Sequence, residues 1–326
     1  MGRVNTRQPV PAWTDLPPAA GAVVMATGIL SVGLELTAQH SLSLAAMVVA
    51  ALLWLLLAAE FGWRLLRDTT RFGAEADTPP ALTAVAATAV LGTRLSMFGW
   101  QTVAAVLLVL AAAVWPVLLG AVMLHWSRRM PGAAFLVCVA TQSLAVLAGT
   151  LAVPDHQRWL ARTGLVFFLL GLLLYLEALT RFDPGQLRTG HGDHWIAGGA
   201  LSISALAGAR LTASAVWTGS GHAALRTITL VLLGLALAGY VVLVVCEVLW
   251  PRPRYDIRRW STVFPLGMTA AACLATADAA RVHWLRTLGQ VLLWIGVAAW
   301  VLTLAWLVAA MTRLGSGGEP NRRPVH

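Results

Sequence analysis

The stretch AAFLVCVATQSLAVLAGTLA, residues 133–152, is followed after a short break by WLARTGLVFFLLGLLLYLEALTR, residues 159–181. As a helix, each stretch is long enough to cross the ~30 Å hydrocarbon core of a bilayer, which takes about 20 apolar residues. The two differ in bulk, because Ala, Gly, Ser and Thr make up half of the first, whereas Leu and aromatic residues dominate the second. Together they predict a transmembrane hairpin with one slender helix and one bulky helix.

The same pairing of a small-residue span with a bulky span occurs five times along the chain. The small-residue spans hold 54 Ala, Gly, Ser and Thr in 97 residues and lie at 17–37, 81–97, 133–152, 195–213 and 261–280. The bulky spans hold 39 such residues in 130 and lie at 42–66, 101–126, 159–181, 223–250 and 284–311. Small residues let helices approach closely or leave room for a lumen, whereas bulky apolar residues suit a wall that faces lipid. We therefore predict an all-α membrane protein of ten transmembrane helices, arranged as five tandem hairpins around a central pore.

A glycine recurs near the end of four of the five small-residue spans. Gly33, Gly92, Gly149 and Gly208 are separated by 59, 57 and 59 residues, and a fifth copy, CLATADAAR at 273–281, has no glycine. One repeat corresponds to one hairpin, and five units of equal topology close most simply about one axis. The alternative is coincidence, since Gly and Ala are frequent throughout this chain.

The overall composition requires lipid as the main solvent. The mean hydropathy is +0.74, with 58% hydrophobic and 11% charged residues, which excludes a soluble domain of 326 residues. The chain has 23 Arg and no Lys, and a cytoplasmic N-terminus places 16 of these arginines inside and 7 outside. We therefore predict a multi-pass plasma-membrane protein, with cytoplasmic tails at 1–16 and 312–326 flanking a transmembrane domain at 17–311. The net charge of +9 then reflects topology and does not indicate nucleic-acid binding.

Signatures of enzymes and metal sites are missing from the sequence. It contains no HExxH zinc site, GxSxG nucleophile elbow or P-loop, and its three Cys residues are isolated in three different spans. We therefore expect no enzyme activity, no cofactor and no metal. One motif favours an alternative, an intramembrane aspartyl protease, because GHGD at 190–193 fits GxGD and Tyr255 precedes Asp256. A catalytic carboxylate pair would have to meet inside the membrane, whereas both motifs lie in polar loops, so we disfavour this alternative.

Three segments carry a family resemblance. PAAGAVVMATGILS at 18–31, DHWIAGGALS at 193–202 and WSTVFPLGM at 260–268 resemble the first, seventh and ninth spans of the tellurite-resistance and C4-dicarboxylate transporter family. That family also contains the plant guard-cell slow anion channels and fungal sulfite and malate exporters. The resemblance covers nearly the whole chain, and one departure is Ala26, where many members have Gly. It implies an anion channel or channel-like carrier, usually a homotrimer in which each protomer has its own pore.

The resemblance also implies a pore gate, because members of the family plug the pore with a phenylalanine on the ninth span. The matching residue is Phe264, which directly precedes Pro265. A proline inside a helix removes a backbone hydrogen bond and bends the axis. The neighbouring phenyl ring can then point into a lumen, where a hydrophobic constriction blocks ions by dewetting. The alternative is that Phe264 packs between helices.

Charged and polar residues within the spans are further candidates. Arg94 and Arg210 each follow a repeat glycine by two residues, and they either form a positive rim that attracts anions or snorkel to the interface. Thr27 and Gln142 lie on small-residue spans, where they either line the lumen or hydrogen-bond one helix to another. Glu35 is either a proton-coupling group or an interfacial carboxylate.

Three more glutamates lie near the predicted cytoplasmic ends of bulky spans, and we expect each to pair with a nearby arginine: Glu60 with Arg64, Glu177 with Arg181, and Glu247 with Arg252. A lumen lined by small and hydroxyl side chains selects anions by its electrostatic field and by the width of the pore. Tellurite, sulfite, malate, nitrate and chloride are therefore all compatible with it. The alternative to a channel is a proton-coupled exporter of dicarboxylate, sulfite or tellurite.

Overall fold

The computed structural model describes residues 20–67, 76–154, 157–251 and 256–316. Within these ranges the chain is helical and has no β-strand beyond an isolated bridge between Met130 and Phe182. Seven of the described helices are long and apolar enough to cross a membrane. The prediction of an all-α membrane protein is therefore confirmed at this level.

Helices of 15 residues or more alternate between shorter and longer ones along the described chain. The shorter are α1 (Gly21–Leu36), α4 (Thr83–Met97), α6 (Leu136–Ala152), α9 (Ile196–Thr212) and α11 (Trp260–Ala279). The longer are α2 (His40–Arg67), α5 (Gln101–Leu124), α7 (Arg158–Arg181), α10 (Gly219–Leu249) and α12 (Trp284–Ser316). Short elements connect some of these: the one-turn helix α8 (Gln186–Thr189) and the 3₁₀ turns η3 (Pro79–Leu82), η4 (Gly132–Phe135), η5 (Asp193–Trp195) and η6 (Ile257–Arg259).

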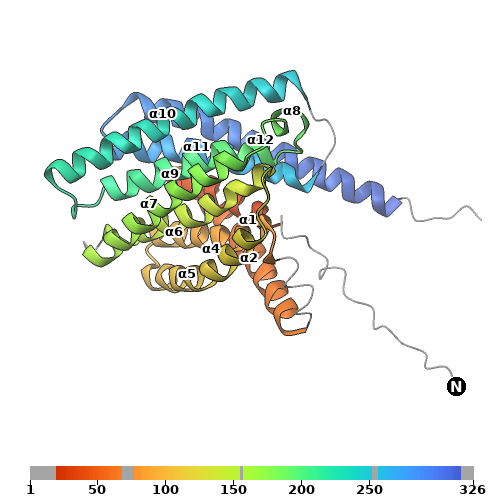
Figure 1. Cartoon of the computed structure of the whole chain (residues 1–326), viewed down its shortest axis with the longest axis horizontal. Helices are drawn as coiled ribbons and strands as arrows, with labels where there is room; N and C mark the ends of the chain where they lie inside the picture. Colours follow the sequence, from red (N-terminus) through yellow and green to blue (C-terminus); the bar gives the residue numbers. More distant parts are fainter. Residues whose placement is uncertain (1–19, 68–75, 155–156, 252–255, 317–326) are drawn as a thin grey trace, which may run out of the picture.

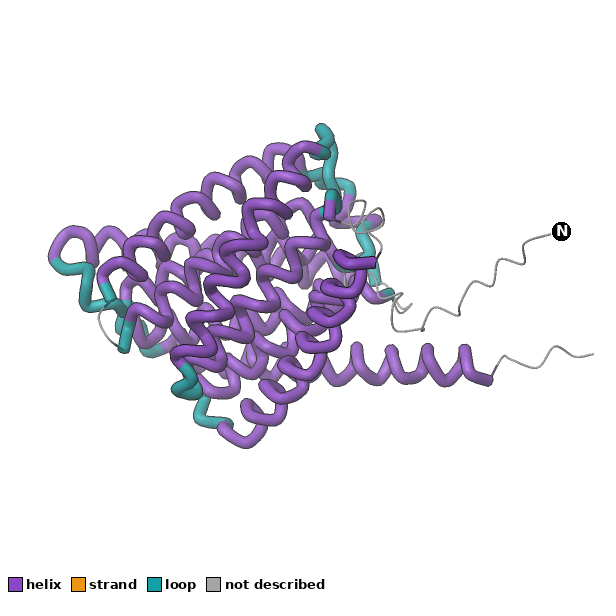
Figure 2. The backbone as a smooth tube through the Cα atoms, turned by 90° about the horizontal axis from the view of Figure 1, so that it is seen from below, coloured by secondary structure: helices purple, strands orange, loops and turns teal. Residues whose placement is uncertain are grey.

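The five shorter helices pack against one another in a closed cycle, which we call the inner ring. In order around it, α1 contacts α4, α4 contacts α6, α6 contacts α9, α9 contacts α11, and α11 returns to α1. Each shorter helix also packs against the longer helix that follows it in the chain. The helices cross the molecule side by side, and the end of α12 extends beyond the others (Figures 1 and 2).

Burial separates the two sets of helices. Every residue of α6 is buried, and so is nearly all of α11. The longer helices expose large apolar side chains along much of their length, for example Val109 on α5, Leu173 on α7 and Val248 on α10. Such a surface is unfavourable in water, so lipid is the solvent that these helices face.

Glycines permit the close helix crossings within the inner ring. A Cβ added to Gly92 of α4 would lie 2.8 Å from the Cδ2 atom of Leu147 on α6, and one added to Gly149 of α6 would lie 3.1 Å from Cβ of Arg210 on α9. The other two repeat glycines, Gly33 and Gly208, face the longer helices α12 and α10 instead. The four positions are thus equivalent in sequence spacing but not in their neighbours.

Tryptophan–threonine hydrogen bonds fasten longer helices to shorter ones at three joints. In each case the indole N–H of a longer helix donates to a threonine hydroxyl of the next shorter helix around the inner ring. The pairs are Trp54–Thr88 at 2.8 Å, Trp115–Thr141 at 2.9 Å and Trp300–Thr27 at 3.0 Å. The third pair joins the last helix to the first and so closes the cycle.

Candidate functional site

Phe264 lies near the start of α11, next to a proline inside the helix. Pro265 packs against α9, where a Cβ added to Gly199 would lie 2.8 Å from its Cγ atom. One turn further, the Thr269 hydroxyl donates to the Pro265 carbonyl oxygen at 2.8 Å and lies 2.8 Å from the Ser202 hydroxyl of α9. Contacts with α9 therefore hold this side of α11 in place.

The neighbours of α11 indicate where Phe264 points. Leu266 packs outward against Trp195 of η5 and Leu243 of α10. A Cβ on Gly267, by contrast, would meet Ile29 of α1 at 3.1 Å. Successive residues of a helix are about 100° apart, so a side chain two residues from Leu266 lies about 200° around the axis. Phe264 and Met268 meet this condition, and both are buried. They thus face the inside of the inner ring.

Arg210 occupies a different part of the inner ring, at the end where the shorter helices pass into short loops. We call this end the short-loop end. A cavity of about 610 Å³ opens there, and we call it the vestibule. Its lining comes from the ends of α1, α9 and α11 and the start of α10: Leu36, Ala209, Arg210, Thr212, Ala213, His222, Arg226, Ala275, Asp278, Ala279, Ala280 and Arg281.

The Arg210 side chain extends across the mouth of the inner ring. Its Nη2 atom lies 3.7 Å from the sulfur of Met97, at the end of α4, which α6 separates from α9 in the ring. Its Nε atom is buried and has no hydrogen-bond partner among the described residues. The charge of Arg210 is therefore present at the vestibule without a carboxylate within ion-pair distance in the described chain.

Arg94 has a different environment, although its position in the repeat is the same. It is buried, and its Nη2 atom lies 2.7 Å from the Glu35 carboxylate of α1. Its Nε atom donates to the hydroxyls of Ser31 at 3.1 Å and Ser43 at 2.9 Å. The structure thus places Arg94 against α1 and α2 in an ion pair, away from the vestibule.

Thr27 and Gln142 both make contacts between helices. Thr27 accepts the indole N–H of Trp300 on α12 and donates to the carbonyl oxygen of Val23. The Gln142 amide donates to the carbonyl oxygen of Phe168 on α7 at 3.1 Å. Of the two roles expected for these residues, this placement favours the helix-to-helix one.

Carboxylates at the predicted cytoplasmic ends of the longer helices pair with arginines. Glu60 pairs with Arg64, and Glu177 with Arg181 at 2.7 Å, as the sequence predicts. Glu247 pairs with Arg259 of η6 at 2.7 Å, whereas the predicted partner Arg252 lies outside the described residues. Glu35, in addition to Arg94, contacts the exposed His40 imidazole at 3.0 Å. These four carboxylates are engaged with basic side chains.

Asp256, one of the two aspartates of the protease alternative, is engaged in an ion pair. Asp256 precedes α11 and pairs with Arg258 at 2.8 Å. The hydrogen bond from Arg258 is the main cause that holds the pKa of Asp256 below its ordinary value. An aspartyl dyad needs one carboxyl with a raised pKa, which is the opposite direction. Tyr255, the other residue of this motif, lies outside the described residues. Nothing in the site supports proteolysis.

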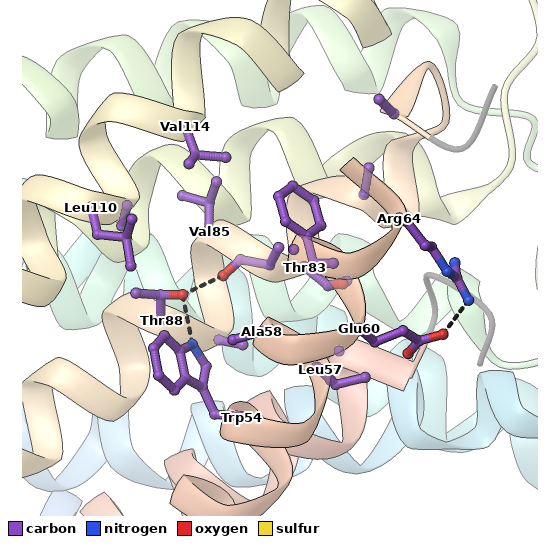
Figure 3. A pocket seen from close by; sticks show the side chains of 18 residues that line it. Trp54, Leu57, Ala58, Glu60, Arg64, Thr83, Val85, Thr88, Leu110 and Val114 are labelled. Carbon is purple, nitrogen blue, oxygen red and sulfur yellow. Dashed lines mark hydrogen bonds and ion pairs between the residues drawn. The ribbon is translucent and has the colours of Figure 1, made fainter. Parts of the chain in front are cut away.

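A second cavity of about 270 Å³ lies between the first two helix pairs, lined by α2, α4, α5 and the start of α1 (Figure 3). The Glu60–Arg64 ion pair lies at one side of it and the Trp54–Thr88 hydrogen bond at another (Figure 3). Most of its lining is apolar, including Leu57, Val85, Leu110 and Val114.

Sequence patterns did not single out Arg226 as a neighbour of Arg210. Arg226 and Arg281 line the same vestibule. A signal for them was present, since both belong to the 7 arginines on the predicted outer side. Sequence spacing alone does not show that α10 and the end of α11 meet at α9.

Long apolar helices around a buried helical core define a multi-pass membrane protein. The family model described as voltage-dependent anion channel matches residues 15–308, so the chain belongs to that family. This confirms the resemblance to the tellurite-resistance and slow anion channel family. A comparison with curated proteins found no match. Membership indicates anion transport across a membrane.

Proposed function

We propose that this protein conducts small anions across the membrane through the inner ring, with Phe264 as the gate. The observation that carries the proposal is the position of Phe264 on the inner side of α11, beside Pro265 and opposite the outward-facing Leu266. The helices of the inner ring are rich in small residues, because the five corresponding spans hold 54 Ala, Gly, Ser and Thr in 97 residues. A phenyl ring at that place excludes water and therefore ions.

Electrostatics supports anions as the permeant species. Arg210 provides a positive charge at the short-loop end, and its guanidinium has no carboxylate partner among the described residues. Low-dielectric walls focus the field of such a charge and raise the local anion concentration. Arg94 does not contribute to this field to the same extent, because Glu35 neutralises it.

The proposed function also includes an arrangement in the membrane. We propose ten spans in five hairpins, with the inner ring as the pore of one protomer in a plasma-membrane homotrimer. The excess of arginine at the opposite end supports an orientation with the short-loop end outside and both termini in the cytoplasm. The tails at 1–16 and 312–326 flank the pore domain.

The runner-up is a proton-coupled exporter of dicarboxylate, sulfite or tellurite. One observation favours it: Glu35 lies between the Arg94 guanidinium at 2.7 Å and the His40 imidazole at 3.0 Å, so a titratable pair adjoins the inner ring. A channel carries net current, whereas cotransport of one proton with each monovalent anion is electroneutral.

Reconstitution into liposomes tests both readings. A channel produces anion-replacement currents that follow the ease of anion dehydration, and a carrier produces electroneutral uptake that depends on a proton gradient. Purified protein that supports neither current nor proton-dependent uptake of any of the candidate anions contradicts the proposed function.

A further inference from the structure

We propose that the vestibule is a binding site for a small oxyanion, held directly by the guanidinium of Arg210. In transport this site would load the anion before it reaches Phe264, and that role rests on the proposed function. The binding itself can be measured without transport.

The hydrogen bonds that Arg210 lacks are the first argument. Its Nε atom is buried without a partner among the described residues, and its Nη2 atom has only the sulfur of Met97 at 3.7 Å. A thioether is a weak acceptor, and a partly buried guanidinium with no carboxylate in contact leaves part of its hydrogen-bonding capacity unused. An anion from solvent supplies both the acceptor and the charge.

The contrast with Arg94 shows how these requirements are met when the protein itself provides the acceptors. Arg94 has a carboxylate at 2.7 Å and two hydroxyls within 3.1 Å, although its buried Nη1 atom has no partner among the described residues. In the described part of the chain no oxygen lies within hydrogen-bond distance of the Arg210 guanidinium, where the cavity of about 610 Å³ opens instead. Arg94 thus faces the Glu35 carboxylate, whereas Arg210 faces an open cavity that an anion from solvent can enter.

The other charged groups of the vestibule favour an anion as well. Arg226 and Arg281 line it. The Nε–H group of Arg226 donates a hydrogen bond to the Ala280 carbonyl oxygen at 3.2 Å. The one carboxylate in the lining, Asp278, is bound by Arg286 at 2.9 Å and 3.2 Å. The cavity lining therefore carries more positive than negative charge, and the Asp278 carboxylate is paired with Arg286, which is not part of that lining.

The guanidinium selects the chemical class of the ligand. Its N–H groups form a planar fork that matches two oxygens of a carboxylate or similar oxyanion, whereas a spherical halide engages it less well. The fork is positioned by α6, because Cβ of Arg210 lies against Gly149 with no side chain between the helices. We therefore expect a small oxyanion to bind more tightly than chloride.

Thermal unfolding of the purified full-length protein in nanodiscs tests the site, with acetate and chloride as probes of equal charge. At fixed ionic strength, a ligand that binds the folded state raises the unfolding midpoint, and the rise grows with the logarithm of its concentration relative to its dissociation constant. Acetate should stabilise the wild type at a lower concentration than chloride. Arg210→Gln should raise the apparent dissociation constant for acetate by roughly tenfold or more, as expected for loss of charge-assisted hydrogen bonds. Arg158→Gln, which removes an arginine at the same end but outside the vestibule, should leave it unchanged.

Arg210→Lys keeps the charge but removes the fork, so it should bind both anions with no preference for acetate. Acetate binding that is unchanged in Arg210→Gln overturns the site. If that variant fails to fold, an acetate preference that persists in Arg210→Lys overturns it instead. Wild-type protein that binds acetate in this way but carries no anion flux in liposomes contradicts the proposed function and leaves the site intact.

Discussion

Trp300 donates its indole N–H to the hydroxyl of Thr27 at 3.0 Å, which joins the last long helix to the first short one. The two residues are 273 positions apart in the chain, so the contact closes the whole cycle of helices. In a bilayer a polar group without a partner is costly, so such a bond favours one arrangement of apolar helices over others.

Removal of this bond should destabilise the fold without blocking the pore. Trp300→Phe keeps an aromatic side chain but loses the N–H, and we expect a loss of about 1 kcal/mol in the free energy of unfolding. Trp294→Phe is the matched control, because Trp294 lies on the same helix with its side chain exposed toward lipid. Equal unfolding midpoints of the two variants in nanodiscs would contradict a role for the bond.

Phe264→Ala should increase anion conductance, because it removes the phenyl ring proposed to exclude water from the inner ring. Currents in proteoliposomes measure the effect, with Phe264→Leu as the volume control. If Phe264 only packs between helices, the change instead leaves a cavity that costs roughly 3 to 5 kcal/mol, with poor expression and no gain of current. Well-folded Phe264→Ala protein with a flux no greater than that of the wild type would rule out the gate.

Arg94→Gln and Arg210→Gln should have opposite phenotypes. The first leaves Glu35 and the buried Ser31 and Ser43 hydroxyls without their donor, so we expect a loss of about 1 to 3 kcal/mol in unfolding free energy. The second removes a charge without such partners and should leave folding intact while it reduces anion entry. That reduction should be greatest at low salt, where screening is weakest. Anion flux that is insensitive to Arg210→Gln at every ionic strength would leave Arg210 as an interfacial anchor.

Reporter fusions at Pro9 and at Gly317 should both indicate the cytoplasm. This follows from the 16 to 7 distribution of arginines and from an even number of spans. Alkaline phosphatase and a fluorescent protein, which are active on opposite sides of a bacterial inner membrane, give complementary signals in such an assay. An external signal at either position would contradict the ten-span arrangement.

Much of the fold is predictable from the sequence because burial in a membrane protein depends on side-chain bulk. The stretch 133–152, half of it small residues, became α6 with every residue buried, and the Leu-rich stretch 159–181 became the largely exposed α7. Helix ends were less predictable. The span expected at 261–280 is preceded by the 3₁₀ turn η6, which begins at Ile257 after the Asp256 side chain accepts the backbone N–H of Arg258.

The sequence by itself determined the class of protein, the alternation of slender and bulky helices, and the family, because these depend on composition and on local motifs such as Phe264-Pro265. Only the tertiary structure distinguished the surroundings of Arg94 from those of Arg210. The two arginines have the same spacing from a repeat glycine, yet Arg94 meets Glu35 and two hydroxyls, whereas Arg210 meets a cavity. Whether a charge is neutralised depends on which other helix lies beside it, and that neighbour is set by packing across the inner ring.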